Sequence, residues 1–280
     1  MKFLFRKISG IYLMMVIGVS TTHAQTSSTY LYLKPIYCFP GASQTLEQNS
    51  RSLGGATYSQ GVYGSFATGL AFQLGIGKMI NTNFGVEIAG EWLNGNKVHS
   101  DISYDTGALS IHGSGTDRIQ SFMLKPMLIL RSSGDLLSFY SKLGIVISVY
   151  SQGTSQGSFT APDTNQQIKL TSLTEVTKIK PKVGFAAAFG VSARVSQSIA
   201  LTLEVSGQMM SLPEKNGYYT QYEENGVNVL PSKSVNFKSW TYEKSIIEGG
   251  PLIENKPDTR LYSPLNFSYV GLSIGIRYYF

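Results

Sequence analysis

The last fourteen residues of the chain, Phe267 to Phe280, alternate between two kinds of side chain. One parity is apolar or aromatic and consists of Val270, Leu272, Ile274, Ile276, Tyr278 and Phe280. The other parity is mostly small or polar and consists of Gly271, Ser273, Gly275, Arg277 and Tyr279. Because successive side chains of a strand point to opposite faces, this segment predicts a strand with one lipid-facing side and one side facing a crowded lumen. An amphipathic strand can also end a soluble sandwich, so the rest of the chain must decide.

The amino terminus has the pattern of a secretory signal peptide. Lys2, Arg6 and Lys7 precede an apolar run over residues 8–19, which is too short to span a bilayer, and a small-residue cleavage site ends at Ala24. We therefore predict a signal peptide over residues 1–24 and a mature chain over residues 25–280. An anchor helix or a buried helix is the alternative. No Cys follows the cut, so we do not expect a lipoprotein anchor.

The charge and cysteine content exclude several classes of function. The net charge of +6 falls to about +3 once the leader is removed, and Lys and Arg are scattered rather than clustered, so we expect no nucleic-acid partner. Cys38 is the single cysteine, which excludes an internal disulfide. No Cys/His cluster has the spacing of metal ligands, and no motif indicates a cofactor, so we expect neither.

The mature chain favours an all-β fold. It is rich in Gly, Tyr and Phe, has no long helical period, and lacks an apolar run long enough for a membrane helix. A chain of this kind can cross a membrane only as a closed barrel. Eight alternating segments fit the strands of such a barrel: residues 29–39, 66–79, 84–93, 119–131, 138–150, 180–195, 198–210 and 267–280.

The connections between these segments differ in length in a regular way. Three are tight turns, at residues 81–83, 132–135 and 196–197, whereas the other four are long and polar: residues 40–65, 94–118, 151–179 and 211–266. Short turns at one end and long loops at the other are typical of outer-membrane barrels, whose short side is periplasmic. We predict a monomeric, closed, antiparallel up-and-down transmembrane β-barrel of eight strands, with both termini on the periplasmic side. A hairpin within Ser234 to Ile247 would make ten strands.

The pattern resembles a known family of proteins. The leader, the eight segments, the loop asymmetry and the closing strand with Tyr278 and Phe280 resemble the small outer-membrane barrels typified by the OmpA membrane domain and OmpX, and the porin-family barrels of Gram-negative bacteria. The resemblance implies the cell outer membrane as location, outer-membrane lipid and lipopolysaccharide as surroundings, and recognition of Tyr278 and Phe280 by the barrel-assembly machinery. Unlike OmpA, no domain follows the barrel in this sequence, so tethering to peptidoglycan is not implied.

Charged residues of both signs fall on the inward parity. They form the predicted lumen charge cluster of Lys34, Glu87, Glu91, Lys125, Lys142, Glu204 and Arg277, and Arg277 is expected nearer the rim together with Arg131 and Arg194. Because an unpaired buried charge is strongly destabilising, we expect ion pairs that plug the lumen. Charges solvated by lumen water, or a gate that passes ions when the pairs rearrange, are the alternatives. Pro35 and Pro126 interrupt two of the strands, and each removes a ladder donor.

The long connection over residues 211–266 is the candidate contact surface. It carries Tyr218, Tyr219, Tyr222, Trp240 and Tyr242 among mixed charges, as recognition surfaces do. We expect it to bind an extracellular ligand or surface. The alternative is a protruding extension of the barrel strands, with the same aromatics packed on one another.

One motif indicates catalysis. His112-Gly113-Ser114 has the His-x-Ser spacing of the outer-membrane lipid A deacylases, but it lies in a Gly- and Ser-rich stretch that has the composition of a loop, and no acidic partner is evident. We expect a non-enzymatic envelope protein with a structural or surface-interaction role. A narrow ion or small-solute pore is the alternative, and a lipid-modifying enzyme is a more distant one.

Overall fold

A computed structural model of the chain describes residues 28–53, 56–105, 110–134, 136–162, 168–246 and 255–280. The predicted signal peptide lies outside the described residues, as does Asp135 in the second tight turn. Within the described ranges, no helix is long and apolar enough to cross a membrane.

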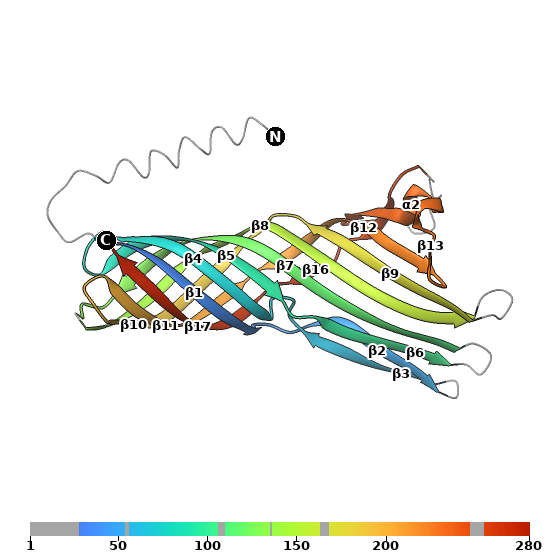
Figure 1. Ribbon diagram of the computed structural model, residues 1–280, viewed down its shortest axis with the longest axis horizontal. Coiled ribbons are helices and arrows are strands. Elements are labelled where there is room, and N and C mark those ends of the chain that lie inside the picture. The colour runs from blue at the N-terminus through green and yellow to red at the C-terminus, as the bar shows by residue number, and fades with distance from the viewer. Residues whose placement is uncertain (1–27, 54–55, 106–109, 135, 163–167, 247–254) are drawn as a thin grey trace.

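Eight strands close into a barrel (Figure 1). They are β1 (Thr29–Pro40), β4 (Gly69–Met79), β5 (Phe84–Gly95), β7 (Ser110–Arg131), β8 (Leu137–Pro162), β10 (Val183–Arg194), β11 (Ile199–Met209) and β17 (Tyr269–Tyr279). Each pairs antiparallel with the next, and β17 returns to pair with β1. The ring therefore has no free edge, and the predicted closed antiparallel eight-stranded barrel is confirmed.

The exposure of side chains along the barrel strands follows the alternation in the sequence. In β17 the side chains switch between buried and exposed at every residue from Tyr269 to Tyr279. The exposed parity is apolar, with Leu272, Ile274 and Ile276 showing 48% to 66% of their surface. Apolar groups in this number are not left in water around a whole barrel, so the outer surface has the character of one that faces lipid.

The two prolines sit where the ladder is locally interrupted. Pro35 pairs with Phe72 of β4, while the register with β17 skips Lys34 and Pro35. Pro126 pairs with Ile88 of β5, while the register with β8 skips it as well. Each ring therefore lies in a strand whose pairing on one side has a gap, which is where a residue without an N–H is tolerated.

The segments predicted from the sequence to be long loops are largely β-strands. Those beyond the barrel are β2 (Gln44–Leu53), β3 (Ala56–Gly64), β6 (Val98–Asp105), β9 (Ile168–Ile179), β12 (Ser211–Glu224), β13 (Val227–Asn228), β14 (Ser239–Glu243), β15 (Asp258–Leu261) and β16 (Pro264–Asn266), with η1 (Leu230–Ser232) and α2 (Val235–Lys238). With the outer halves of β7 and β8, seven of these strands form a sheet in the order β3-β2-β6-β7-β8-β9-β12-β14-β15, and β13 pairs with the end of β12. We call this sheet, with β13, the extension sheet, whereas β16 pairs with the start of β12 separately. The extension sheet projects from the end of the barrel opposite the start of β1 and the carboxyl terminus (Figure 1).

Two expectations from the sequence are corrected by this sheet. The four long connections are not irregular loops, because their polar residues pair as strands outside the barrel. The hairpin considered within Ser234 to Ile247 is not a ninth and tenth barrel strand either. That stretch holds α2 and then β14, which pairs with β12 and β15 in the extension sheet.

A β-bulge explains why the alternation of side chains did not predict the second half of β8. Phe122 pairs with Tyr150 and Met123 with Ser148, so Val149 is an extra residue in β8. Val149 and Tyr150 are both exposed, and Ser148 and Ser151 both point inward, where their hydroxyls lie 2.8 Å apart. A bulge of this kind shifts the parity of everything beyond it, so an alternation counted from the barrel fails there.

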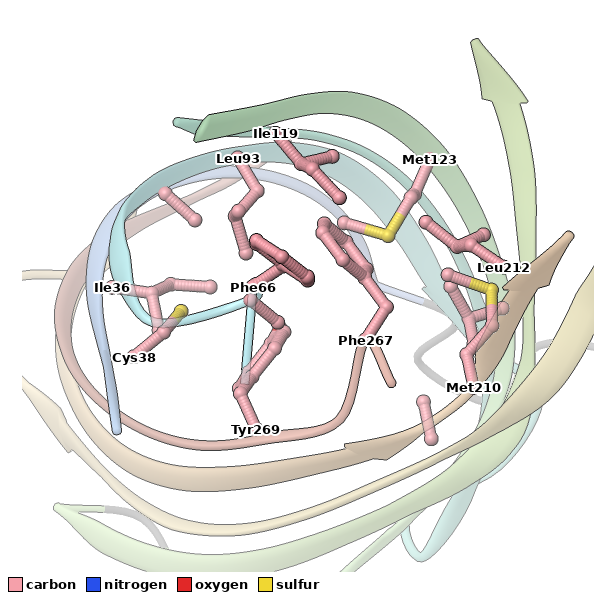
Figure 2. Packing of buried hydrophobic residues seen from close by; sticks show 14 of the residues in the cluster. Ile36, Cys38, Phe66, Leu93, Ile119, Met123, Met210, Leu212, Phe267 and Tyr269 are labelled. Carbon is pink, nitrogen blue, oxygen red and sulfur yellow. The ribbon is translucent and has the colours of Figure 1, made fainter. Parts of the chain in front are cut away.

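The barrel interior is filled in layers. We call the end with the start of β1, the carboxyl terminus and the tight turns the turn end, and the opposite one the loop end. An apolar cluster fills the interior towards the loop end, with Phe66, Phe267 and Tyr269 near the axis and Leu93, Ile119 and Met123 against the wall (Figure 2). The hydroxyl of Ser65 donates to the carbonyl of Ser268 at 2.7 Å, which ties the Phe66 segment to that of Phe267. Deeper layers towards the turn end contain the lumen charges and a group of tyrosines.

Candidate functional site: the filled lumen and the extension sheet

The structure places all seven members of the lumen charge cluster inside the barrel. Their exposed fractions run from 0% to 4%. Six of them form ion pairs among themselves, in two separate networks.

The larger network is a chain of charges centred on Lys142. Its Nζ lies 2.8 Å from Glu87 and 3.0 Å from Glu204, and Glu204 also pairs with Lys34. The four groups come from β1, β5, β8 and β11, so the network joins strands from around the barrel. Removing any one member would leave a buried charge of the opposite sign without compensation.

Three tyrosine hydroxyls complete this network. Tyr30 and Tyr32 donate to the two carboxylate oxygens of Glu87 at 2.9 and 2.6 Å, and Tyr140 donates to Glu204 at 3.1 Å. The Tyr32 and Tyr30 rings pack directly on the main chain of Gly75 and Gly77. A Cβ added at Gly75 would come within 2.5 Å of the Tyr32 ring, and one at Gly77 within 2.2 Å of the Tyr30 ring. The small inward residues of β4 are therefore the space that the tyrosines occupy.

Arg277 balances its charge in a different way. Its guanidinium lies 4.4 Å from the centre of the Tyr30 ring and 4.9 Å from that of Tyr140, and it donates to the hydroxyl of Tyr279 at 3.4 Å. Contacts between a cation and ring faces are worth more when the cation is desolvated, as it is here. They accommodate the fourth cation of a cluster that has three carboxylates.

The smaller network is a triangle nearer the loop end. Lys125 donates to Glu91 at 2.6 Å and to the hydroxyl of Tyr269 at 2.7 Å, and that hydroxyl donates to Glu91 at 2.8 Å. The sequence indicated the charges through their inward parity but not the tyrosines. The available signal was the inward parity of Tyr30, Tyr32, Tyr140 and Tyr269 on the same strands.

These contacts determine what the lumen can do. The interior of an eight-stranded barrel is just wide enough for side chains, and here those side chains are paired ions, tyrosines and an apolar layer. The arrangement supports ion pairs that plug the lumen. It also differs from charges solvated by lumen water, because the six paired groups are at most 4% exposed.

Above the apolar layer, a cavity opens where the barrel meets the extension sheet. Its volume is about 340 Å³, and Asp117, Arg118, Glu175 and Glu214 are among its lining residues. Burial, with a smaller contribution from the neighbouring Glu175, raises the pKa of Glu214 to about 7 against the opposing hydrogen bonds from Tyr242 and the main chain of Ser263. Burial also raises the pKa of Glu175. The polar mouth of the barrel thus holds carboxyl groups that favour the protonated form more than free ones do.

The aromatic residues predicted to form a contact surface pack mainly on one another. The Tyr219 ring lies 5.1 Å from Trp240 and 5.8 Å from Tyr222, and Phe237 packs against both tyrosines. Trp240 is 1% exposed and is covered by the guanidinium of Arg260 at 3.6 Å, so it supports the extension sheet and does not offer a contact surface itself. The structure thus corrects the prediction for Trp240, whereas contact through the other candidate aromatics stays a prediction.

The other members of that set are partly buried. Tyr218 lies under the ammonium of Lys178 at 5.7 Å, and Tyr242 hydrogen-bonds to Glu214. The more exposed aromatics of the extension sheet are Tyr58 and Tyr63 on β3, at 67% and 70% exposed. Sequence reasoning missed them, because their connection, residues 40–65, is shorter and has fewer aromatic residues than the one over residues 211–266.

The His-x-Ser pair lies on a strand and not in a loop. His112 and Ser114 are exposed on β7, and they face Ser103 and Asp101 of β6. Nδ1 of His112 lies 3.1 Å from the hydroxyl of Ser103, so the bond at that nitrogen goes to a different serine from the one in the motif. Among the described residues, no three His, Cys, Asp or Glu side chains gather in a way that could hold a metal ion.

Comparisons with known proteins identify no family for this chain. No family model matches the chain, and no curated protein matches it. Among solved structures, the outer membrane protein OprG from Pseudomonas aeruginosa matches with a TM-score of 0.43 and 10% identity over 92% of this chain and 98% of that one. Ail, the attachment invasion locus protein of Yersinia pestis, in complex with the heparin analogue sucrose octasulfate, matches with a TM-score of 0.33 and 11% identity over 91% and 99%. Similarity at this level says nothing about what this chain binds.

Proposed function

We propose that this chain is an outer-membrane protein in which a filled barrel anchors an extension sheet at the cell surface, and that the sheet makes the functional contacts. The observation that carries the proposal is the length of β7 and β8, which have 22 and 26 residues. A tilted strand needs only about 9–11 residues to cross a bilayer. About half of each strand therefore stands outside the membrane, paired with polar strands instead of lipid.

The exterior of the barrel supports the membrane placement. Its apolar residues surround the ring of eight strands, whereas the faces of β9 and β12 beyond it are rich in Thr, Ser, Gln, Glu and Lys. Contact with hydrocarbon requires an apolar exterior and a backbone that is fully paired, and the closed barrel provides both. The outer membrane is the bacterial membrane in which barrels of this size reside.

Labelling of single cysteines tests the orientation. Val227 is 63% exposed on the extension sheet, and Thr82 is exposed in a tight turn at the opposite end. In intact cells, a membrane-impermeant maleimide should modify Val227→Cys at once and Thr82→Cys only after the outer membrane is opened. The native Cys38 is buried and serves as the unlabelled background. The reverse pattern would reject the orientation, and equal labelling of both in a soluble periplasmic fraction would reject the membrane placement.

Bilayer recordings address the alternative of a narrow pore. The lumen is occupied by paired charges and by the apolar layer around Phe66 and Phe267, which favours a barrel that does not conduct. We expect no steady unitary conductance from the inserted protein. A steady conductance that Glu87→Gln or Lys125→Met alters would favour the pore instead.

A further inference from the structure

A cavity at the turn end of the barrel combines two arginines with a set of hydrogen-bond donors. Its volume is about 310 Å³, and it lies between the tight turns, next to Ser28. Its lining consists of Ser28, Met79, Asn81, Thr82, Arg131, Ser132, Ser133, Gly134 and Arg194. It is separate from the lumen networks and from the cavity under the extension sheet, whose lining residues are different.

Within the part of the chain that the structure describes, the two arginines are held in place by contacts other than ion pairs. Nε of Arg131 donates to the hydroxyl of Ser138 at 3.1 Å, and the guanidinium of Arg194 lies over the Tyr279 ring at 5.2 Å. No carboxylate among the described residues lies within ion-pair distance of either arginine. This contrasts with the three lumen lysines, each of which has a carboxylate partner.

The other polar groups of the cavity also favour an anion. The side-chain oxygen of Asn81 already accepts the main-chain N–H groups of Asn83 and Phe84 at 2.9 and 2.7 Å, so the amide donor of Asn81 is the end left for a ligand. Ser132 Oγ accepts from the N–H of Phe139 at 2.9 Å, which leaves its hydroxyl proton to be donated. Two guanidinium groups with amide and hydroxyl donors around them match the acceptor oxygens of a phosphate.

The position of the cavity indicates where such a phosphate comes from. Three exposed apolar residues adjoin the lining residues along the chain or through the main chain: Leu136 is 75%, Val195 65% and Ile80 44% exposed. The main-chain N–H of Arg194 donates to the carbonyl of Leu136 at 2.8 Å, so one arginine is fixed directly to this apolar rim. A ligand here would meet cations at its head and an apolar surface along its tail.

We propose that this cavity binds the phosphate of a phospholipid headgroup in the leaflet at the turn end, with the acyl chains lying along Leu136 and Val195. The proposal rests on the membrane placement given above. A bidentate or stacked guanidinium is not replaced by an ammonium, so Arg131→Lys should weaken the site although the charge is kept.

Lipid titration of the full-length protein in a neutral detergent tests the proposal. Native mass spectrometry would count bound phosphatidylglycerol in the wild type, in the double variant Arg131→Gln/Arg194→Gln, and in the control Lys180→Gln/Lys182→Gln, which removes two exposed cations near the loop end. We expect about tenfold weaker binding in the first double variant and no change in the control. Equal binding in all three proteins would overturn the proposal.

Two further probes separate the sources of binding. Diacylglycerol with the same acyl chains should bind at least about tenfold more weakly than phosphatidylglycerol. If it binds equally well, apolar contact alone explains retention and the headgroup site is wrong. If inorganic phosphate binds as tightly as the lipid, the lipid is not the ligand and the proposal is again overturned.

Two controls keep the result interpretable. Heat-modifiable migration on gels and insertion into vesicles report the barrel independently, so a failure of membrane placement is distinguishable from a failure of lipid binding. If the double variant does not fold, Arg194→Gln alone is measured instead, with the same expected direction. Asp135→Asn removes the acidic residue that the sequence places in the same turn, and it should leave lipid binding unchanged or make it tighter. Weaker binding in Asp135→Asn would contradict a site that selects an anion.

Discussion

At the scale of single residues, the lumen shows how a barrel too narrow for water accommodates charge. Each lumen carboxylate accepts hydrogen bonds from at least one lysine and one tyrosine. Desolvation makes every member costly alone, and the pairing offsets that cost only when the geometry is complete. Removing one partner of an ion pair should therefore be far more destabilising than replacing both partners by uncharged residues.

The Lys125–Glu91 pair provides the test of that statement. Lys125→Met should lower the free energy of unfolding by about 3–5 kcal/mol, because it leaves a carboxylate that is 0% exposed without its cation. The double variant Lys125→Met/Glu91→Gln should recover most of the loss, since the amide oxygen still accepts from Tyr269. Urea unfolding in lipid vesicles measures both. A double variant no more stable than the single one would contradict the pairing account.

Glu214 predicts a pH dependence in the extension sheet. Its pKa is raised from 4.5 to about 7, chiefly by burial, so the folded state holds the proton more tightly than the unfolded state. The stabilisation is fully present below about pH 4.5 and is lost as the pH rises through about 7. Hydrogen exchange of the amides in β12 and β14, corrected for the intrinsic rate, should show weaker protection at pH 8 than at pH 5. Glu214→Gln should flatten most of this difference, and an unchanged profile in that variant would assign the effect elsewhere.

At the scale of elements, the extension sheet and the barrel share β7 and β8, but only the barrel closes into a ring. The barrel closes through pairing of β11 and β1 with β17, from Ile199 with Tyr278 to Phe39 with Val270. The extension beyond Pro213 adds strands only to β9 and to itself. The ring therefore does not depend on β12, β14 or β15 for its hydrogen bonds.

Deletion of residues 215–262 tests this independence. Leu212 pairs with Leu265, and Pro213 with Pro264, so the cut ends already lie side by side and a short Gly-Ser linker can join them. We expect the shortened chain to fold into a heat-modifiable barrel with its stability close to that of the full chain. A matched chain that lacks residues 270–280 should not fold, because β1 and β11 would both lose their partner. Failure of the 215–262 deletion to fold would show that the extension is part of the barrel's folding unit.

At the scale of the whole molecule, the proposed membrane placement divides the exposed apolar side chains into a group that faces lipid and a group that faces water. Ile274 in the barrel and Val227 in the extension sheet are similarly exposed, at 66% and 63%. Bare exposure cannot distinguish lipid from water, but the response to a charge can, because an arginine in hydrocarbon must leave or distort the bilayer while one in water is solvated at once.

Arginine substitution at these two positions makes the distinction. Ile274→Arg should destabilise the vesicle-inserted protein by about 2–4 kcal/mol, as at lipid-facing positions of other barrels. Val227→Arg should change the free energy of unfolding by less than about 0.5 kcal/mol. Urea titrations in vesicles measure both. Equal effects at the two sites would mean that the barrel exterior does not face hydrocarbon.

The barrel itself was predictable from the sequence because each of its strands has one apolar face and one small or polar face. A period of two between apolar and small or polar residues is a local signal, and the inward lysines and glutamates followed from the same count. Tight turns such as the one at Asn81 are local as well, since their hydrogen bonds join residues two or three apart. These features need no knowledge of the partner strand.

The remainder depended on pairing between distant residues. The extension strands have water on both faces over much of their length, so no apolar alternation marks them, and the bulge at Val149 shifts the parity of β8 at the point where it leaves the barrel. The sequence determined a ring of eight strands with an apolar exterior and a charged interior. Only the tertiary structure decided which tyrosine meets which carboxylate, that Trp240 lies inside, and that two arginines from different turns share one cavity, because those contacts are set by strand register and closure across dozens of residues.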